Sequence, residues 1–193
     1  YEFRDMWSVK ETASERLFDG VRADLGKLAL ASYCAEVTEA LAEEGQPDPG
    51  LLAVTLNCLH ALDKLNCPLA QVKTAFEWRS MALAGYEPQI GRCGVCAREQ
   101  PREPHIHLGE GTLHCAPCRD KLGEGVSMPL TPAALAALRH IVWGPRKRLL
   151  SFRLDAEGLS KLSDASEAYL MTRLERGFRT LDFYKRITYQ PSL

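Results

Sequence analysis

Four of the seven cysteines in this 193-residue chain stand in two Cys-x-x-Cys pairs, Cys93 with Cys96 and Cys115 with Cys118. Two residues between cysteines allow both sulfurs of one turn to point at the same ion, and a hairpin between the pairs would bring the second turn opposite the first. Gly109-Glu110-Gly111, just before the second pair, suits such a reversal. We predict that these four thiolates bind one structural Zn²⁺ ion and leave no coordination position open for catalysis.

Other interpretations of the same cysteines remain open from the sequence. An iron–sulfur cluster also uses thiolate ligands, and the pairs could instead form two disulfides or a redox-active Cys-x-x-Cys. His105, His107 and His114 lie nearby in the chain, and one of them could replace a thiolate.

Composition favours a folded protein of the reducing cytoplasm. Hydrophobic residues make up 46% of the chain, yet no apolar run is long enough to span a membrane, so we expect no membrane association. The start of the chain lacks the basic and apolar regions of a signal peptide. An odd number of cysteines does not suit a secreted disulfide framework. Because the chain begins at Tyr1 rather than Met, we expect it to be a fragment.

Hydrophobic periodicity predicts a mainly α-helical bundle. We expect an amphipathic helix from about Thr12 to Gly45, and further helices over about 51–65, 69–84, 131–143 and 160–179. The helix over 51–65 has the widest apolar face, which places it at the centre of the bundle. Thr131 and Pro132 have the residue types of an N-cap and a first helical position. Residues 88–128, rich in glycine and proline and containing the paired cysteines, interrupt this pattern as an inserted zinc-binding segment.

The charges are unevenly distributed, although the formal net charge is only −1. Residues 139–193 carry 11 Lys or Arg against 6 Asp or Glu. Within this part Arg146-Lys147-Arg148 follows a Gly-Pro turn, with Arg139 upstream and Trp143 and Phe152 interleaved. Cations beside aromatic rings can bind phosphates and stack on unpaired bases, so these residues are candidates for nucleic-acid or partner binding, although three adjacent charges in a loop are often simply solvated.

The sequence contains no pattern typical of an active site. It has no glycine-rich phosphate loop, no Gly-x-Ser-x-Gly elbow and no His-Glu-x-x-His pair. The acidic residues fall mainly on the polar sides of the predicted helices. We therefore predict that the protein is not an enzyme.

With these pieces placed, the order of motifs resembles the bacterial DNA repair and recombination mediator family RecO. The resemblance covers nearly the whole chain and rests on these segments: Arg22-Ala23-Asp24-Leu25 with Ala31-Ser32-Tyr33; Phe76-Glu77 with Ala84-Gly85-Tyr86-Glu87-Pro88; Cys93-Gly94-Val95-Cys96; Gly109 to Cys118; and Arg179-Thr180-Leu181-Asp182-Phe183-Tyr184. It implies an N-terminal OB-fold, a helical domain and an inserted zinc-binding segment whose ligands map onto Cys93, Cys96, Cys115 and Cys118. Most of the OB-fold is missing here, with residues 1–10 as a remnant ending in one strand. We therefore expect three parts of the chain: the OB-fold remnant over residues 1–10, a helical domain over 11–87 and 129–193, and the zinc-binding segment over 88–128.

The resemblance also implies a function. Such proteins bind and anneal single-stranded DNA and help RecA to replace single-stranded-DNA-binding protein, usually together with RecR, in the cytoplasm at the nucleoid. An acidic, apolar tail of single-stranded-DNA-binding protein would dock where Arg139 or Arg148 lies beside Leu and Trp side chains. The alternatives are a zinc-stabilised helical adaptor that binds only proteins, and a thiol redox enzyme.

Overall fold

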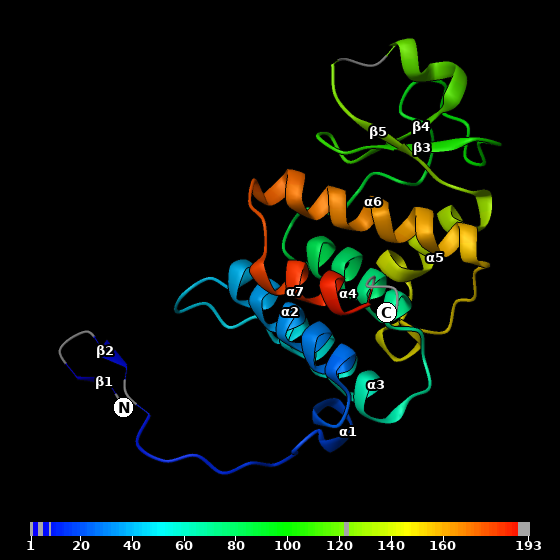
Figure 1. The fold of residues 1–193 in the computed structure, drawn as a ribbon. Helices are drawn as coiled ribbons and strands as arrows, with labels where there is room; N and C mark the ends of the chain where they lie inside the picture. Colours follow the sequence, from blue (N-terminus) through cyan, green and yellow to red (C-terminus); the bar gives the residue numbers. More distant parts are fainter. Residues whose placement is uncertain (1, 4–5, 8, 122–123, 189–193) are drawn as a thin grey trace.

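The computed structural model describes residues 2–3, 6–7, 9–121 and 124–188. Helices dominate it, and a small sheet lies on one side of them, as the sequence predicts (Figure 1). The helices are α1 (Asp19–Arg22), α2 (Leu25–Leu41), α3 (Pro49–Lys64), α4 (Leu69–Leu83), α5 (Pro132–Trp143), α6 (Ala156–Leu174) and α7 (Arg179–Thr188), with 3-10 turns η1 (Ala116–Lys121) and η2 (Arg146–Arg148). The strands are β1 (Glu2–Phe3), β2 (Met6–Trp7), β3 (Pro104–His107), β4 (Thr112–Cys115) and β5 (Ser127–Pro129).

Side-chain caps fix where four of the helices begin. The carboxylates of Asp24, Asp48 and Asp155 each accept a hydrogen bond from a backbone N–H in the first turn of α2, α3 and α6, at 2.8–2.9 Å. Thr131 caps α5 through its hydroxyl, 3.0 Å from the nitrogen of Ala134, and Pro132 follows it. The predicted cap and first position of this helix are confirmed.

The prediction of one helix from Thr12 to Gly45 is wrong. Residues 9–18 are not helical. Helix α1 is short and separate, and α2 ends at Leu41. The apolar spacing from Val21 through Leu25 to Leu28 continues across the break. The periodicity therefore gives no sign of the break between α1 and α2, whereas the N-cap residue Asp24 indicates that a new helix begins there.

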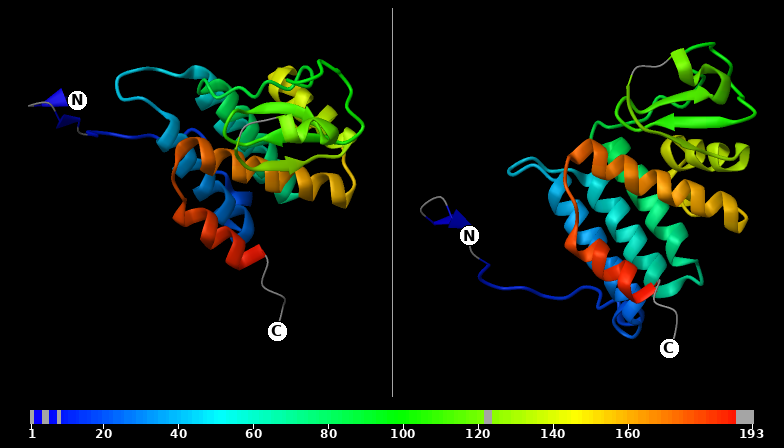
Figure 2. Two further views of the ribbon diagram at one scale, coloured as in Figure 1. Left: turned by 90° about the horizontal axis from the view of Figure 1, so that it is seen from above. Right: turned by 45° about the horizontal axis from the view of Figure 1, so that its top comes forward.

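The expected last helix over 160–179 is likewise two helices. Glu175 adopts the left-handed conformation (φ 52°) and ends α6, and α7 then turns back to pack against α2. In Figure 2 the two helices are seen as separate rods joined by a bend. Glu36 of α2 holds the start of α7, because its carboxylate accepts hydrogen bonds from the backbone N–H and the hydroxyl of Thr180.

The centre of the bundle is α4 and not, as we expected, the helix over 51–65. Helix α4 contacts α2, α3, α5 and α6. Its Phe76 and Trp78 are fully buried, and Trp78 stacks on Tyr169 of α6 with ring centroids 4.9 Å apart. By contrast α3 lies at the outside, with Leu52 57% and Leu56 45% exposed.

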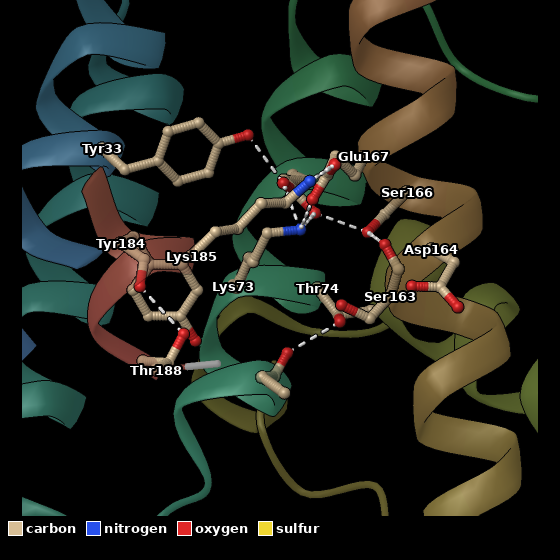
Figure 3. A network of polar contacts seen from close by, with 12 residues as sticks. Tyr33, Lys73, Thr74, Ser163, Asp164, Ser166, Glu167, Tyr184, Lys185 and Thr188 are labelled. Atoms are coloured by element: carbon tan, nitrogen blue, oxygen red, sulfur yellow. Dashed lines mark hydrogen bonds and ion pairs between the residues drawn. The ribbon is translucent and has the colours of Figure 1, made fainter. Parts of the chain in front are cut away.

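A buried polar network connects the central helix with its neighbours (Figure 3). The ammonium group of Lys73 lies 2.9 Å from one oxygen of Glu77 and 3.1 Å from Glu167 of α6. Tyr33 of α2 donates a hydrogen bond to Glu77 at 2.6 Å, and Lys185 of α7 forms an ion pair with Glu167. The network thus links four helices, with Lys73 and Glu77 buried at its centre and Lys185 partly exposed at its edge.

At the N-terminus the structure has two very short antiparallel strands rather than the single strand we expected. In β1 and β2, Glu2 lies opposite Trp7 and Phe3 opposite Met6. Tyr1 lies outside the described residues. The assignment of residues 1–10 to an OB-fold, and the division at 11–87, 88–128 and 129–193, stay predictions.

Gly111 gives a test of how the sheet packs on α6. Its φ is 69°, and an added Cβ would lie 2.7 Å from the hydroxyl of Tyr169. We expect Gly111→Ala to lower the free energy of unfolding by about 2–3 kcal/mol, combining the cost of a left-handed alanine with a steric clash. Gly45→Ala is the matched control, because Gly45 has a φ of 75° but open space around it. It should cost only about 1 kcal/mol in thermal or denaturant unfolding. Equal losses in the two variants would contradict the close packing of Gly111 against Tyr169.

Candidate metal centre

A β-hairpin forms the framework of the segment that carries the paired cysteines. Strands β3 and β4 are antiparallel, with Pro104 opposite Cys115 and His107 opposite Thr112, and β5 pairs with the other edge of β3. The chain reverses between β3 and β4 at Gly109 to Gly111, as predicted. The hairpin brings Cys115 to the end of β4, and η1 follows directly with Cys118.

The loop with the first pair of cysteines is attached to this hairpin by backbone hydrogen bonds. The nitrogen of Gly94 donates to the carbonyl oxygen of Leu113 in β4 at 2.8 Å, while the nitrogen of Cys93 donates to the carbonyl oxygen of Arg98 at 2.8 Å and closes the loop on itself. Ala97 has a positive φ of 58°, which turns the chain tightly after Cys96. Both cysteine turns therefore face one point, as the spacing indicates.

The four sulfur atoms of Cys93, Cys96, Cys115 and Cys118 lie within 4.8 Å of one another. The Sγ atoms of Cys96 and Cys115 are 3.6 Å apart, close to the roughly 3.8 Å edge of a tetrahedron of thiolates around zinc. This separation is far longer than the roughly 2.0 Å bond of a disulfide, and all seven cysteines are free. The geometry and the donor set thus fit a metal ion bound by four thiolates.

The protonation of the cluster also suits a cation. Burial acts to raise the pKa of Cys93, but backbone N–H groups of Cys96, Val95 and Cys115 outweigh it and lower the pKa to about 6. Burial, reinforced by a hydrogen bond with Cys96, raises the pKa of Cys115 to about 12. Without a cation, part of the cluster therefore remains as neutral thiols, and a bound metal ion would compensate the charge of additional thiolates.

The three nearby histidines are placed away from the sulfur cluster. The ring nitrogens of His114 lie 3.1 Å from the carbonyl oxygen of Cys115 and 2.8 Å from the hydroxyl of Ser127. The Nδ1 atom of His107 accepts a hydrogen bond from the backbone of Glu110 at 3.1 Å. His105 stacks on His114. Among the described residues, the cluster with metal-binding geometry contains the four cysteines alone.

Two arginines of the helical bundle hold the cysteine-bearing segment in place. Arg139 of α5, a predicted binding residue, donates hydrogen bonds to the carbonyl oxygens of Ile90, Gly91 and Glu99 at 2.9, 3.0 and 2.6 Å. Arg173 of α6 donates to the carbonyl oxygen of Gly109, and its guanidinium lies 5.3 Å from the centroid of the Tyr86 ring. No sequence signal indicates this role of Arg173, because a hydrogen bond to a distant backbone carbonyl leaves no local pattern.

The other candidate binding residues lie together on the surface. Arg146, Lys147 and Arg148 form η2 directly after α5, and all three are exposed. Arg139 is on α5, only seven positions before Arg146 in the chain, but its guanidinium is directed at the cysteine loop. Within the described parts of the chain, no helix combines the length and the apolar content that crossing a bilayer requires.

Comparison with known proteins agrees with this arrangement. Residues 22–182 match the family model described as "Recombination protein O C terminal". A protein named DNA repair protein RecO from Desulforudis audaxviator (strain MP104C) is 31% identical over 186 residues, which are 95% of this chain and 72% of that protein. Proteins of the same name from Acetivibrio thermocellus and Anaeromyxobacter sp. (strain K) are 26% and 29% identical, over 97% and 95% of this chain and 74% and 71% of their own lengths. The chain therefore belongs to the RecO family of DNA repair proteins.

Proposed function

We propose that this protein acts as a mediator of DNA repair and homologous recombination that binds and anneals single-stranded DNA and assists the loading of RecA. The observation that carries this proposal is the family match over residues 22–182, supported by the exposed cations of η2. Its action is physical: cations neutralise phosphates, the bound strands pair, and no covalent bond changes. The protein is accordingly not an enzyme in this proposal.

The resident metal in this proposal is one structural Zn²⁺ ion. Cys93, Cys96, Cys115 and Cys118 would hold it, and four thiolates in a tetrahedral arrangement favour zinc over hard cations such as Mg²⁺ or Ca²⁺. When bound, the ion supplies folding free energy to the hairpin and the turns around it rather than reactivity.

The proposed partners follow from the family. They are single-stranded DNA, RecR, the C-terminal tail of single-stranded-DNA-binding protein and, indirectly, RecA. In this proposal the protein acts in the cytoplasm, at the nucleoid. The exposed cations of η2 support an acidic partner, whether phosphate or carboxylate.

Binding of an oligonucleotide should weaken steeply with salt. If the three cations of η2 contact phosphates, the logarithm of the affinity for labelled oligo(dT) should fall against the logarithm of the salt concentration with a slope of about −2. Lys147→Ala should reduce the slope by about 0.7. Lys64→Ala, which removes an exposed cation already paired with Asp63 on α3, should leave it unchanged. Fluorescence anisotropy across a salt series measures both.

A second candidate is an adaptor that binds only proteins. The exposed Leu52 and Leu56, one turn apart on α3, favour it, because apolar side chains gathered on a helix face suit a protein partner. Absence of oligonucleotide binding even at low salt would favour this adaptor over the mediator.

A further inference from the structure

A groove of about 580 Å³ lies between the loop of the first cysteine pair and the end of α5. We call it the knuckle groove, and its lining includes Pro88, Gly91, Arg92, Gly94, Val95 and Trp143. Cys93 also lines it, so one wall is the turn that belongs to the metal centre. The groove therefore lies where the cysteine segment meets the helical bundle.

Trp143 presents an aromatic ring to this groove in a fixed position. Its side chain is 50% exposed, whereas Trp78 is fully buried in the core. The indole N–H donates a hydrogen bond to a carboxylate oxygen of Glu87 at 2.9 Å, which anchors one edge of the ring. A side chain on Gly91 would come within 3.9 Å of the ring, so the ring lies beside the bare backbone of the loop. An exposed aromatic ring that is already immobilised loses little entropy when a flat ligand stacks on it.

The charges around the groove favour an anionic ligand. Arg92 is an exposed lining residue, and Arg146, Lys147 and Arg148 follow Trp143 in the chain. Across the described ranges, none of these four side chains takes part in an ion pair. The acidic lining residue, Glu87, is engaged with Trp143, and Arg139 fixes the loop through the carbonyl oxygens of Ile90 and Gly91.

From this juxtaposition we infer that the knuckle groove binds an unpaired base of single-stranded DNA. The base stacks on the indole of Trp143, and the flanking phosphates contact Arg92 and the cations of η2. This inference rests on the proposed DNA-binding function and assigns it a site. It also gives the metal centre a role in binding, because the cysteine turn that it holds forms a wall of the groove.

An acidic, apolar peptide fits the groove less well. Such a peptide needs a pocket lined by large aliphatic side chains, but Ile90 in the lining is fully buried, which leaves Val95 as the partly exposed branched aliphatic residue of the groove. The rest of the lining combines the ring of Trp143 and the backbone of Gly91 and Gly94 with the small side chains of Val95 and Ala97. A flat base with hydrogen-bonding edges matches backbone groups and a ring face better than an aliphatic side chain does.

The test measures binding of the metal-loaded chain to labelled oligo(dT) by anisotropy. Trp143→Ala should weaken binding by about 5- to 100-fold, the range of one lost stacking contact, while Trp143→Phe should retain part of the affinity. Phe183→Ala is the matched control, because Phe183 is a 44% exposed aromatic residue on α7. It should bind as the unchanged protein does. Circular dichroism and zinc content of each variant establish that the fold is retained.

The outcomes separate the groove from the function as a whole. If Trp143→Ala binds oligo(dT) like the unchanged protein while Lys147→Ala binds more weakly, the protein binds DNA but the groove assignment is overturned. If the unchanged protein binds no oligo(dT), the proposed function itself fails. If Trp143→Ala loses affinity for an acidic peptide and not for oligo(dT), the groove binds a protein tail and the inference is again overturned.

Discussion

Replacing Cys115 with serine should remove the metal from the protein. A serine hydroxyl is a poor ligand for zinc in place of a thiolate, and the remaining three sulfurs belong to a cluster that the Cys115 sulfur completes. We expect about one equivalent of zinc per chain in the unchanged protein and less than half an equivalent in Cys115→Ser, measured by elemental analysis after dialysis. Among the substitutions considered, this one should have the largest effect on residues 88–128.

The consequence for folding should be local. Cys93, Cys115 and Cys118 form a small cluster of buried residues separate from the main core, with Val95 packed against it. The helices are joined by the main core, which extends into the sheet through residues such as Ile106 and Leu113. Hydrogen exchange should therefore accelerate first in the two cysteine turns, while amides of α2 and α4 remain protected.

Cys58→Ala provides the matched control for this experiment. Cys58 is a fully buried cysteine of α3 that packs in the main core, far from the sulfur cluster in sequence and structure. The variant should keep a full equivalent of zinc and lose about 1 kcal/mol of stability from a small cavity. Retention of zinc in Cys115→Ser, or its loss in Cys58→Ala, would contradict the assignment of the ligands.

The cluster of four cysteines could be predicted from the sequence because its information is local. Two residues between cysteines and glycines at the reversal determine the geometry of each turn, whatever the rest of the chain does. The residues that hold this segment on the helices could not be found in this way. Arg173 and Gly109 are 64 positions apart, and Arg139 and Ile90 are 49 apart. Their hydrogen bonds depend on how the helices pack, which periodicity does not specify.

The errors in the helices have the same origin. Leu174 and Phe178 keep the four-residue spacing of a continuous helix, so the sequence does not show that α6 ends between them, at Glu175. The central position of α4 was missed because a helix surrounded on several sides has no pronounced amphipathic pattern. Lys73 and Glu77, four residues apart, have the spacing of a surface ion pair, yet they are 3% and 0% exposed.

Replacing Glu77 with alanine should destabilise the helical bundle more than any other single change of a charged residue among those described. The substitution removes the acceptor used by Tyr33, Lys73 and Ser166, and leaves Lys73 with Glu167 as its remaining ion-pair partner. Breaking a buried pair by removing one member typically costs about 3–5 kcal/mol, because the other charge stays buried and loses much of its compensation. We expect a loss of this size in denaturant unfolding, with little change in the slope of the free energy against denaturant concentration.

The chain contains its own control for this prediction. Glu157 and Lys161 form an ion pair with the same four-residue spacing on α6, but their side chains are 67% and 37% exposed. Glu157→Ala should cost less than about 1 kcal/mol, because water screens the pair and solvates the remaining ammonium group. The difference between the two variants therefore measures the contribution of burial rather than of charge pairing. Similar losses in both variants would show that water reaches Lys73 and Glu77, and the network would then not act as a buried link between α2, α4, α6 and α7.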